Sequence, residues 1–438
     1  MTPTSPANIV LRLHADEILD SRGVPTIEVT IALSGSSGEE VATASVPSGK
    51  STGRNEALER RDGDPARFGG KGVLGAVSAV RGEIAKALVG QPLPTQQELD
   101  RHLVQLDGTP NKSRLGANAI LGTSLAAARA RSQVAGVRLF ESLATELGRE
   151  EPTLLPVPCF NVINGGAHAP NALDFQEFML APAGRPTFAE ALRAGAECYH
   201  ALAAILDARG LSTAVGDEGG FAPAIEKPTE ALDLLVEAIE RAGYRPGEDV
   251  FIALDPAASG FSSGGIYRFA GEEADAAAMA VMYATWLGHY PIISIEDGLA
   301  EDDIDGWIHL TREIGGRVQL VGDDTLVSDA SRVRDAIARR IGNAVLLKPN
   351  QIGTLAEIDA TARVAREGGF RAMMSHRSGE TNDAFVADLA VAFGTGQIKA
   401  GAPARGERVA KYNELSRIER YLGRRARFAG KAGFARPT

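Results

Sequence analysis

The segment Asn343-Ala-Val-Leu-Leu-Lys-Pro-Asn-Gln-Ile-Gly-Thr-Leu355 decides the fold. Its apolar run, Ala344 to Leu347, has no polar alternation, which is typical of a strand buried on both faces of a parallel sheet. The run ends at Lys348, at the carboxyl end of the expected strand. Because burial disfavours a charged ammonium, we expect a lowered pKa there, as a general base needs. If the segment is considered alone, a lysine whose ammonium reaches water is a simpler interpretation than a general base.

Short apolar runs of the same kind alternate with long helical patterns from about Leu154 onward, which is the signature of βα units and a parallel sheet. One of the helices, Glu230 to Ala242, carries an apolar stripe, with Thr229 as its expected N-cap. So many units predict a closed barrel of roughly eight strands, with a doubly wound open sheet as the alternative. The runs are 157–163, 250–254, 292–295, 318–321, 344–347, 371–374 and 396–398.

The first 145 residues have a different pattern and predict a separate α+β domain, followed by the barrel over residues 146–438. Between its strands and its helices lies the glycine-rich loop Pro47–Gly53, which we interpret as a flexible flap or a turn. The expected elements are strands over 27–33 and 41–46 and helices over 75–89, 96–106 and 118–135.

Composition excludes several classes of protein. The 438 residues carry a net charge of -10, which argues against general nucleic-acid binding. No apolar stretch is long enough to span a membrane, and the first residues lack the pattern of a signal peptide. The two cysteines, Cys159 and Cys198, form no metal-binding pattern and are expected to be buried thiols. These features predict a cytoplasmic protein.

Charged or polar residues follow the ends of the later apolar runs. In a barrel the carboxyl ends of the strands meet at one mouth, where catalytic residues lie. A single carboxylate at a strand end is commonly a helix cap, but carboxylates on three successive strand ends require a cation. Oxygen ligands with few histidines favour Mg²⁺ over zinc. The carboxylates are Asp255, Glu296 and Asp323, and the later strand ends carry Lys348, His376 and Lys399.

The basic residues near this mouth suit a small phosphorylated carboxylic acid. Glu218 lies on the glycine-flanked loop Gly216–Gly220 and is a candidate acid opposite the Lys348 base. The residues by themselves therefore predict Mg²⁺-assisted proton abstraction next to a carboxylate.

At these residues, and over nearly the whole chain, the sequence resembles the enolases, the phosphopyruvate hydratases of glycolysis. The matching motifs include Asp20-Ser-Arg-Gly23, Asn164-Gly-Gly166, Gln176-Glu-Phe178, Ser294-Ile-Glu-Asp297, Gly322-Asp-Asp324, Asn350-Gln-Ile-Gly353, Ser375-His-Arg-Ser-Gly-Glu-Thr381 and Val409-Ala-Lys-Tyr-Asn413. The resemblance implies a small α+β cap followed by a (β/α)8-type barrel of the enolase kind, whose second strand runs antiparallel. It also implies Mg²⁺-dependent dehydration of 2-phospho-D-glycerate to phosphoenolpyruvate by a homodimer or octamer.

The resemblance assigns a role to each site residue. Lys348 would remove the C2 proton and Glu218 would protonate the departing C3 hydroxyl. Two Mg²⁺ ions would bind, as in the Lys-base sites of this superfamily. Asp255, Glu296 and Asp323 would hold the first ion, and Ser51 in the flap the second. The residues expected to bind or line the substrate site are His168, Gln176, Glu177, His376, Arg377, Ser378 and Lys399.

The flap also departs from the family pattern, because Lys50 stands where the family has alanine; further departures are Val24, Gly260, Ala400 and Gly406. Either the Lys50 side chain points to solvent, or it binds an extra anionic group. The second hypothesis suits a paralogue of phosphonate natural-product biosynthesis that forms a modified phosphoenolpyruvate, such as carboxyphosphonoenolpyruvate. A non-catalytic binding protein is the alternative of another class, and the complete chemical set argues against it.

Overall fold

A three-stranded antiparallel sheet forms the base of the N-terminal part in the computed structural model, which describes residues 8–35, 38–50 and 53–435. The strands are β1 (Val10–Leu19), β2 (Pro25–Gly35) and β3 (Gly38–Ser45). The predicted strand over 27–33 lies within β2, and the one over 41–46 overlaps β3 and extends one residue past its end. Ile27, Val29 and Ile31 of β2 are fully buried. The sequence pattern did not predict β1, whose register shifts near Val10 and whose outward positions are mostly polar.

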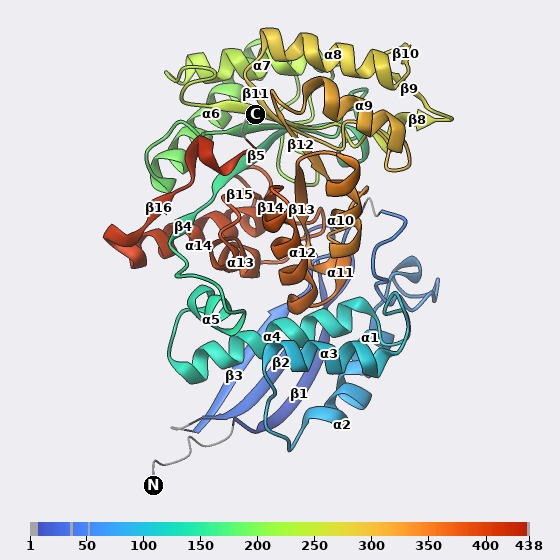
Figure 1. The fold of residues 1–438 in the computed structure, drawn as a ribbon, viewed down its shortest axis with the longest axis vertical. Coiled ribbons are helices and arrows are strands. Elements are labelled where there is room, and N and C mark those ends of the chain that lie inside the picture. The colour runs from blue at the N-terminus through green and yellow to red at the C-terminus, as the bar shows by residue number, and fades with distance from the viewer. Residues whose placement is uncertain (1–7, 36–37, 51–52, 436–438) are drawn as a thin grey trace.

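Helices cover this sheet and lie at one end of the long axis of the molecule (Figure 1). Helix α4 is buried on nearly all sides, as predicted, and packs on β2 and β3. Gly122 permits this approach, because a Cβ there would lie 2.6 Å from Val29 Cγ2. The predicted helix over 75–89 is two α-helical pieces joined by the π-helical turn Val80–Ile84. The helices are α1 (Leu74–Ala79), α2 (Ala85–Leu88), α3 (Gln96–Asp107), α4 (Ala117–Ala135) and α5 (Leu139–Glu146).

The remaining chain forms a closed barrel of eight strands, so the barrel prediction is confirmed and the open-sheet alternative is wrong. Strand β6 runs antiparallel to both of its neighbours, and the other pairs are parallel. This reversal sets Glu177, the first residue of β6, beside Asn164 and Asp255, the last residues of β5 and β7. The barrel strands are β5 (Val157–Asn164), β6 (Glu177–Ala181), β7 (Phe251–Asp255), β11 (Ile292–Glu296), β12 (Gln319–Gly322), β13 (Ala344–Leu347), β14 (Arg371–Ser375) and β15 (Gln397–Lys399).

Helices surround the barrel (Figure 1). The expected Thr229 cap is wrong: α7 begins at Pro228 after Lys227, because proline suits the first helical position. The predicted domain boundary at residue 145 lies in the last turn of α5 and stays a prediction. The helices are α6 (Phe188–Ala208), α7 (Pro228–Arg241), α8 (Ala276–His289), α9 (Ile304–Ile314), α10 (Ala330–Arg339), α11 (Pro349–Ile352), α12 (Leu355–Glu367), α13 (Phe385–Phe393) and α14 (Gly406–Leu422).

Two further small sheets lie outside the barrel wall. A small antiparallel sheet follows β7, and a short parallel pair joins the start of the barrel part to the C-terminal segment. The strands are β8 (Ser262–Ser263), β9 (Ile266–Phe269), β10 (Glu272–Ala274), β4 (Leu154–Leu155) and β16 (Arg427–Phe428).

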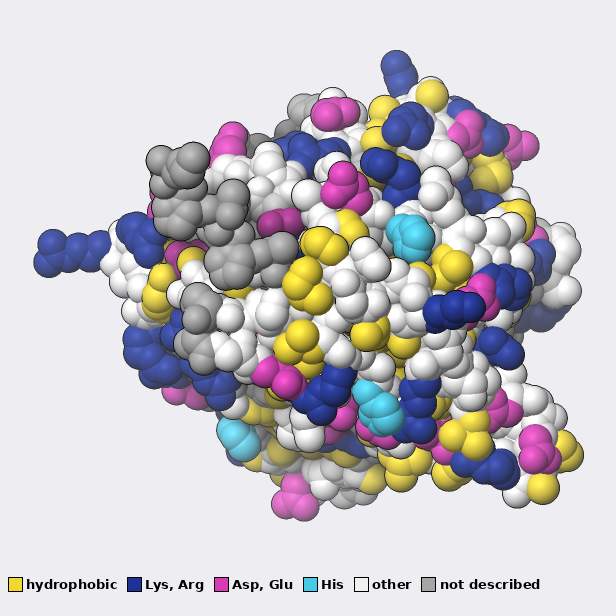
Figure 2. Space-filling model, turned by 90° about the horizontal axis from the view of Figure 1, so that it is seen from below, with side chains coloured by type: hydrophobic (Ala, Val, Ile, Leu, Met, Phe, Trp, Pro, Cys, Tyr) yellow, Lys and Arg dark blue, Asp and Glu magenta, His cyan; other side chains and the backbone are white. Residues whose placement is uncertain are grey.

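The charged surface residues and the two cysteines are placed as the sequence predicted. Basic and acidic side chains are interspersed on the face shown in Figure 2. Among the described residues, no helix is long and apolar enough to cross a membrane. Both cysteines are buried, and burial raises the pKa of each thiol to about 12. These thiols are therefore unreactive at neutral pH.

Candidate active site

The barrel mouth, meaning the carboxyl end of the parallel strands, gathers the predicted residues around a small cavity of about 20 Å³. Five barrel strands, β5, β7, β13, β14 and β15, contribute residues at or beyond their carboxyl ends, and the reversed β6 contributes its start. Glu218 comes from the loop between α6 and α7. The predicted residues that line the cavity are His168, Gln176, Glu177, Glu218, Asp255, Lys348, His376, Arg377, Ser378 and Lys399.

Lys399 lies at the centre of a buried carboxylate cluster. Its Nζ lies 3.0 Å from Asp255 Oδ2, 2.7 Å from Glu296 Oε1 and 3.4 Å from Glu177 Oε1. Burial lowers the pKa of Lys399, but these carboxylates outweigh it and raise the pKa well above its ordinary value. Burial and then the charge of Asp255 raise the pKa of Glu296. The cluster therefore sets three carboxyl groups against one lysine, more than a single ammonium can neutralise when all three are ionised.

Lys348 follows β13 as predicted, and its ammonium forms an ion pair with Asp323, the residue after β12. The expected lowering of its pKa is wrong in this state of the protein. Burial does lower the pKa of Lys348, but the charge of Asp323 outweighs burial and leaves the pKa raised. The same pairing lowers the pKa of Asp323 against the effect of burial. The direction of the pKa shift of Lys348 is therefore decided by an ion pair between two strand ends, which the sequence pattern did not reveal.

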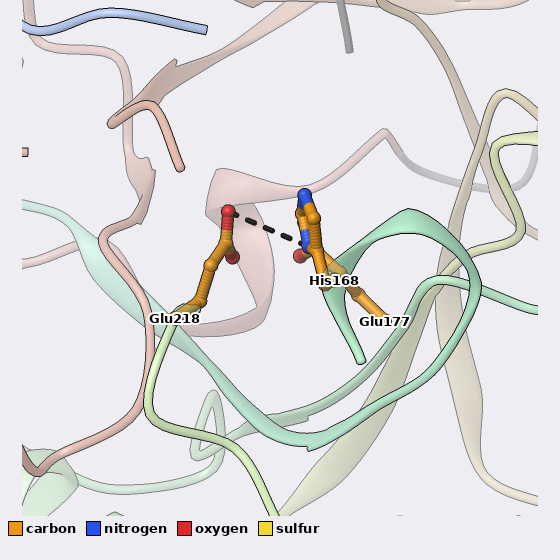
Figure 3. Close-up of side chains that lie close together, drawn as sticks. All are labelled: His168, Glu177 and Glu218. Carbon is orange, nitrogen blue, oxygen red and sulfur yellow. Dashed lines mark ion pairs between the residues drawn. The ribbon is translucent and has the colours of Figure 1, made fainter. Parts of the chain in front are cut away.

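Glu218 faces His168, which lies between Glu218 and Glu177 (Figure 3). His168 Nδ1 lies 3.6 Å from Glu218 Oε1 and 3.7 Å from Glu177 Oε1. Asn161, which the sequence analysis missed, donates a hydrogen bond to Glu218 Oε2 over 3.0 Å. Burial raises the pKa of Glu218, but the interactions with His376 and His168 outweigh burial and leave the pKa well below its ordinary value. In this state Glu218 is a carboxylate.

Arg408, buried in α14, fixes the proton on His376. Its Nη1 lies 2.7 Å from His376 Nδ1, and because a guanidinium can only donate, Nδ1 must accept. The proton of the neutral ring is therefore on Nε2, which lies 3.1 Å from Glu218 Oε2. Burial lowers the pKa of His376 to about 4, so the ring is neutral at neutral pH. The sequence signal for Arg408 was its place directly before the Val409–Asn413 motif.

The described part of the flap, residues 47–50 and 53, lies on the Arg377 side of the mouth. Arg377 is paired with Glu56 over 3.0 Å and donates to Asn350 Oδ1 over 2.9 Å. Gly49 of the flap lies so close that a Cβ there would be 2.0 Å from Arg377 Nη2. Ser48 exchanges two backbone hydrogen bonds with Gly379, at 2.8 and 2.9 Å. The flap therefore lies against the site in this structure. The sequence analysis missed Glu56, an isolated acid in a polar loop.

Lys50 lies on the outer side of the flap. Its backbone N–H donates to Ser378 Oγ over 3.0 Å, while its Nζ lies 2.8 Å from Asp217 Oδ2. The side chain is 44% exposed and lines a pocket separate from the catalytic cavity. Ser51, the expected ligand of a second Mg²⁺, lies outside the described residues.

The carboxylate cluster fits a divalent cation. Glu296 Oε2 is buried and has no hydrogen-bond partner among the residues that the structure describes. Asp255, Glu296 and Asp323 offer only oxygen atoms, the ligands that Mg²⁺ prefers. Carboxylate oxygen atoms of Asp297, Asp323 and Asp324 lie within 4.8 Å of one another, which is the spacing of a metal site that shares only Asp323 with the predicted set. An oxygen-only site with an unpartnered carboxylate oxygen needs a hard cation to satisfy it.

The fold and the site define a class: a barrel with one reversed strand, an N-terminal α+β cap, and a mouth that opposes a lysine to a carboxylate. Residues 10–143 match the family described as "Enolase, N-terminal domain". Residues 152–436 match "Enolase, C-terminal TIM barrel domain". The chain therefore belongs to the enolase family, whose members typically use Mg²⁺.

Proposed function

We propose that this protein catalyses the Mg²⁺-dependent dehydration of 2-phospho-D-glycerate to phosphoenolpyruvate. The observation that carries the proposal is that Lys348 and Glu218 line one small buried cavity, together with Arg377, Ser378 and Lys399. A base and an acid on one cavity suit removal of a proton and a hydroxyl from adjacent carbons. The cationic side chains suit the phosphate and carboxylate groups of the substrate.

In the forward direction Lys348 Nζ takes the proton from C2. Glu218, in its protonated form, gives a proton to the C3 hydroxyl, which leaves as water while the C2–C3 double bond forms. Mg²⁺ held by Asp255, Glu296 and Asp323 would neutralise these carboxylates and stabilise the negative charge that develops on the substrate carboxylate. Arg377 and Ser378 would hold the phosphate, and the remaining residues of the cavity would exclude water.

The protonation states in the structure suit the reverse reaction. A raised pKa keeps Lys348 protonated and a lowered pKa keeps Glu218 ionised. In hydration of phosphoenolpyruvate, Lys348 would give its proton to C2 and Glu218 would take one from water. Mg²⁺ held by Asp323 would offset the charge that raises the pKa of Lys348 and so favour the neutral lysine that the forward direction needs.

Ultraviolet detection of phosphoenolpyruvate tests the proposal. We expect turnover of 2-phospho-D-glycerate that depends on added Mg²⁺ and is greatly reduced in Glu296→Gln, which keeps the shape of the side chain and removes a ligand charge. Lys86→Ala, an exposed change on α2, is the control for handling. A folded protein that binds Mg²⁺ and forms no phosphoenolpyruvate would overturn the proposal.

We propose further that the protein works in the cytoplasm as a homodimer or octamer, as the family resemblance suggests. Sedimentation velocity of the purified chain tests the assembly, and a monomer at every concentration contradicts it. For the alternative, a paralogue that forms a modified phosphoenolpyruvate, Lys50 would have to reach the substrate. Its ammonium instead contacts Asp217 on the outer side of the flap, so no observation on the described residues favours that alternative.

A further inference from the structure

A second pocket lies on the outer side of the flap, and we name it the flap pocket. Its volume is about 530 Å³, far larger than the closed catalytic cavity. Basic side chains outnumber acidic ones in its lining. The charged residues are Arg22, Lys50, Arg61 and Lys71, with Glu59 and Asp217 as the acids.

The basic side chains of the flap pocket are only partly neutralised. Lys50 pairs with Asp217 over 2.8 Å, Arg61 with Glu59 over 2.7 Å and Arg22 with Asp20 over 2.7 Å. The side chain of Lys71 is exposed and forms no ion pair with any residue that the structure describes. A concave site with excess positive charge and one cation without an acidic partner favours a small anion.

The flap backbone is the wall between the two cavities. Ser48, Gly49 and Lys50 line the flap pocket on one side. On the other side Gly49 contacts Arg377, and the Lys50 amide donates to Ser378. Whatever binds in the flap pocket therefore touches the element that covers the catalytic cavity.

We propose that the flap pocket binds a small multivalent anion, a phosphate or carboxylate compound, and that its occupancy holds the flap against the barrel. The anion would replace Asp217 as the partner of Lys50 and join it to Lys71, which follows the flap in the chain. Arg61 forms part of the wall, because its guanidinium already donates to Glu59, Ser48 and the Lys71 carbonyl. The anion would thus form charge-assisted hydrogen bonds with two cations, and such bonds are stronger than neutral ones. The site is distinct from the catalytic cavity and does not depend on the reaction catalysed there.

Equilibrium dialysis with radiolabelled inorganic phosphate, at constant ionic strength, tests the binding. We expect two classes of site in the parent, one at the catalytic cavity and one at the flap pocket. The double variant Lys50→Ala/Lys71→Ala should bind phosphate at the second class of site up to about 25-fold more weakly, because each exposed or half-exposed cation contributes up to about fivefold. Lys86→Ala removes an exposed lysine of the same N-terminal part and should keep both classes.

Hydrogen exchange of the flap amides tests the coupling. The Ser48 amide is bonded to Gly379 and the Lys50 amide to Ser378 Oγ. We expect phosphate to slow exchange in the flap more in the parent and in Lys86→Ala than in the double variant. Identical dialysis curves for the parent and the double variant, or a single class of site in the parent, would overturn the proposed site. Equal protection of the flap in all three proteins would overturn the coupling.

Discussion

The barrel buries polar side chains at both of its ends, but in opposite ways. At the amino end Gln319 and Gln397 form a neutral network: the amide of Gln319 donates to Ser294 Oγ over 3.0 Å and to Gln397 Oε1 over 2.7 Å. Gln397 in turn donates to Gln319 Oε1 and to the Gly433 carbonyl, both over 2.9 Å. At the mouth, Glu296 Oε2 and His168 Nδ1 are buried without hydrogen-bond partners among the described residues.

The difference separates a structural layer from a ligand-binding one. A neutral network with every donor and acceptor paired stabilises the fold and gains nothing from a ligand. Buried charges with unpaired atoms cost free energy until a cation and an anionic substrate complete them. Substitutions at the mouth should therefore change activity more than stability, and substitutions in the network the reverse.

The largest expected effect is on catalysis by Lys348→Ala. Loss of the base should lower kcat by roughly 10²–10⁴-fold while the fold is kept. The measurement is phosphoenolpyruvate formation by ultraviolet absorbance, with circular dichroism to verify folding and Lys86→Ala as the matched lysine control. Activity within a few-fold of the parent would show that Lys348 is not the base.

The next largest effect is on the pH dependence of stability, through His376. Its pKa is lowered to about 4 by burial, whereas an unfolded histidine titrates near 6.5. Between these values the unfolded chain binds the proton and the folded protein does not, so stability falls as the pH drops from about 6.5 to 4. The contribution reaches about 3 kcal/mol, and His376→Gln should remove it. Denaturant unfolding of both proteins at several pH values measures the difference, and parallel curves would contradict a buried neutral ring.

Gln319→Leu tests the other side of the comparison. It leaves the Gln397 amide, the Ser294 hydroxyl and the Ala435 amide without their partner. We expect a loss of about 1–3 kcal/mol in the free energy of unfolding. The activity of the folded fraction should stay close to that of the parent. Urea unfolding and the activity assay are the two measurements. A large loss of activity at unchanged stability would contradict the claim that the amino-end network supports stability and not activity.

The smallest effect is expected for Ser294→Ala in the same layer. Gln319 Nε2 keeps its bond to Gln397 and loses only the serine oxygen. The free energy of unfolding should fall by about 1 kcal/mol, with no change in turnover. Urea unfolding of this variant and of Gln319→Leu side by side measures how much each hydrogen bond of the network contributes to the free energy of unfolding. A loss as large as that of Gln319→Leu would mean that the serine, and not the amide pair, supports the layer.

Much of the barrel follows from local sequence pattern, because a strand buried on both faces reads as an unbroken apolar run. Ala344–Leu347 is predicted to the residue, and the charged residue after it marks the mouth. The polar β1 gives no such signal, and the direction of β6 is set by its pairing with β5 and β7. Only the family resemblance predicted that reversal.

The site shows the same division. The types and positions of the strand-end residues follow from the sequence, but their ionisation does not. The pKa of Lys348 depends on Asp323, 25 residues away in the chain. Arg408 and Glu56 act on His376 and Arg377 from other elements, so only the folded structure connects them.

The most direct test of the central assignment is exchange of the C2 hydrogen of 2-phospho-D-glycerate in deuterated water with Mg²⁺, followed by proton NMR. If Lys348 is the base and Glu218 the acid, Glu218→Gln should exchange the C2 hydrogen while forming little phosphoenolpyruvate. Lys348→Ala should then do neither. Exchange that continues in Lys348→Ala, or that disappears in Glu218→Gln while Lys348→Ala keeps it, would contradict the assignment of the two roles.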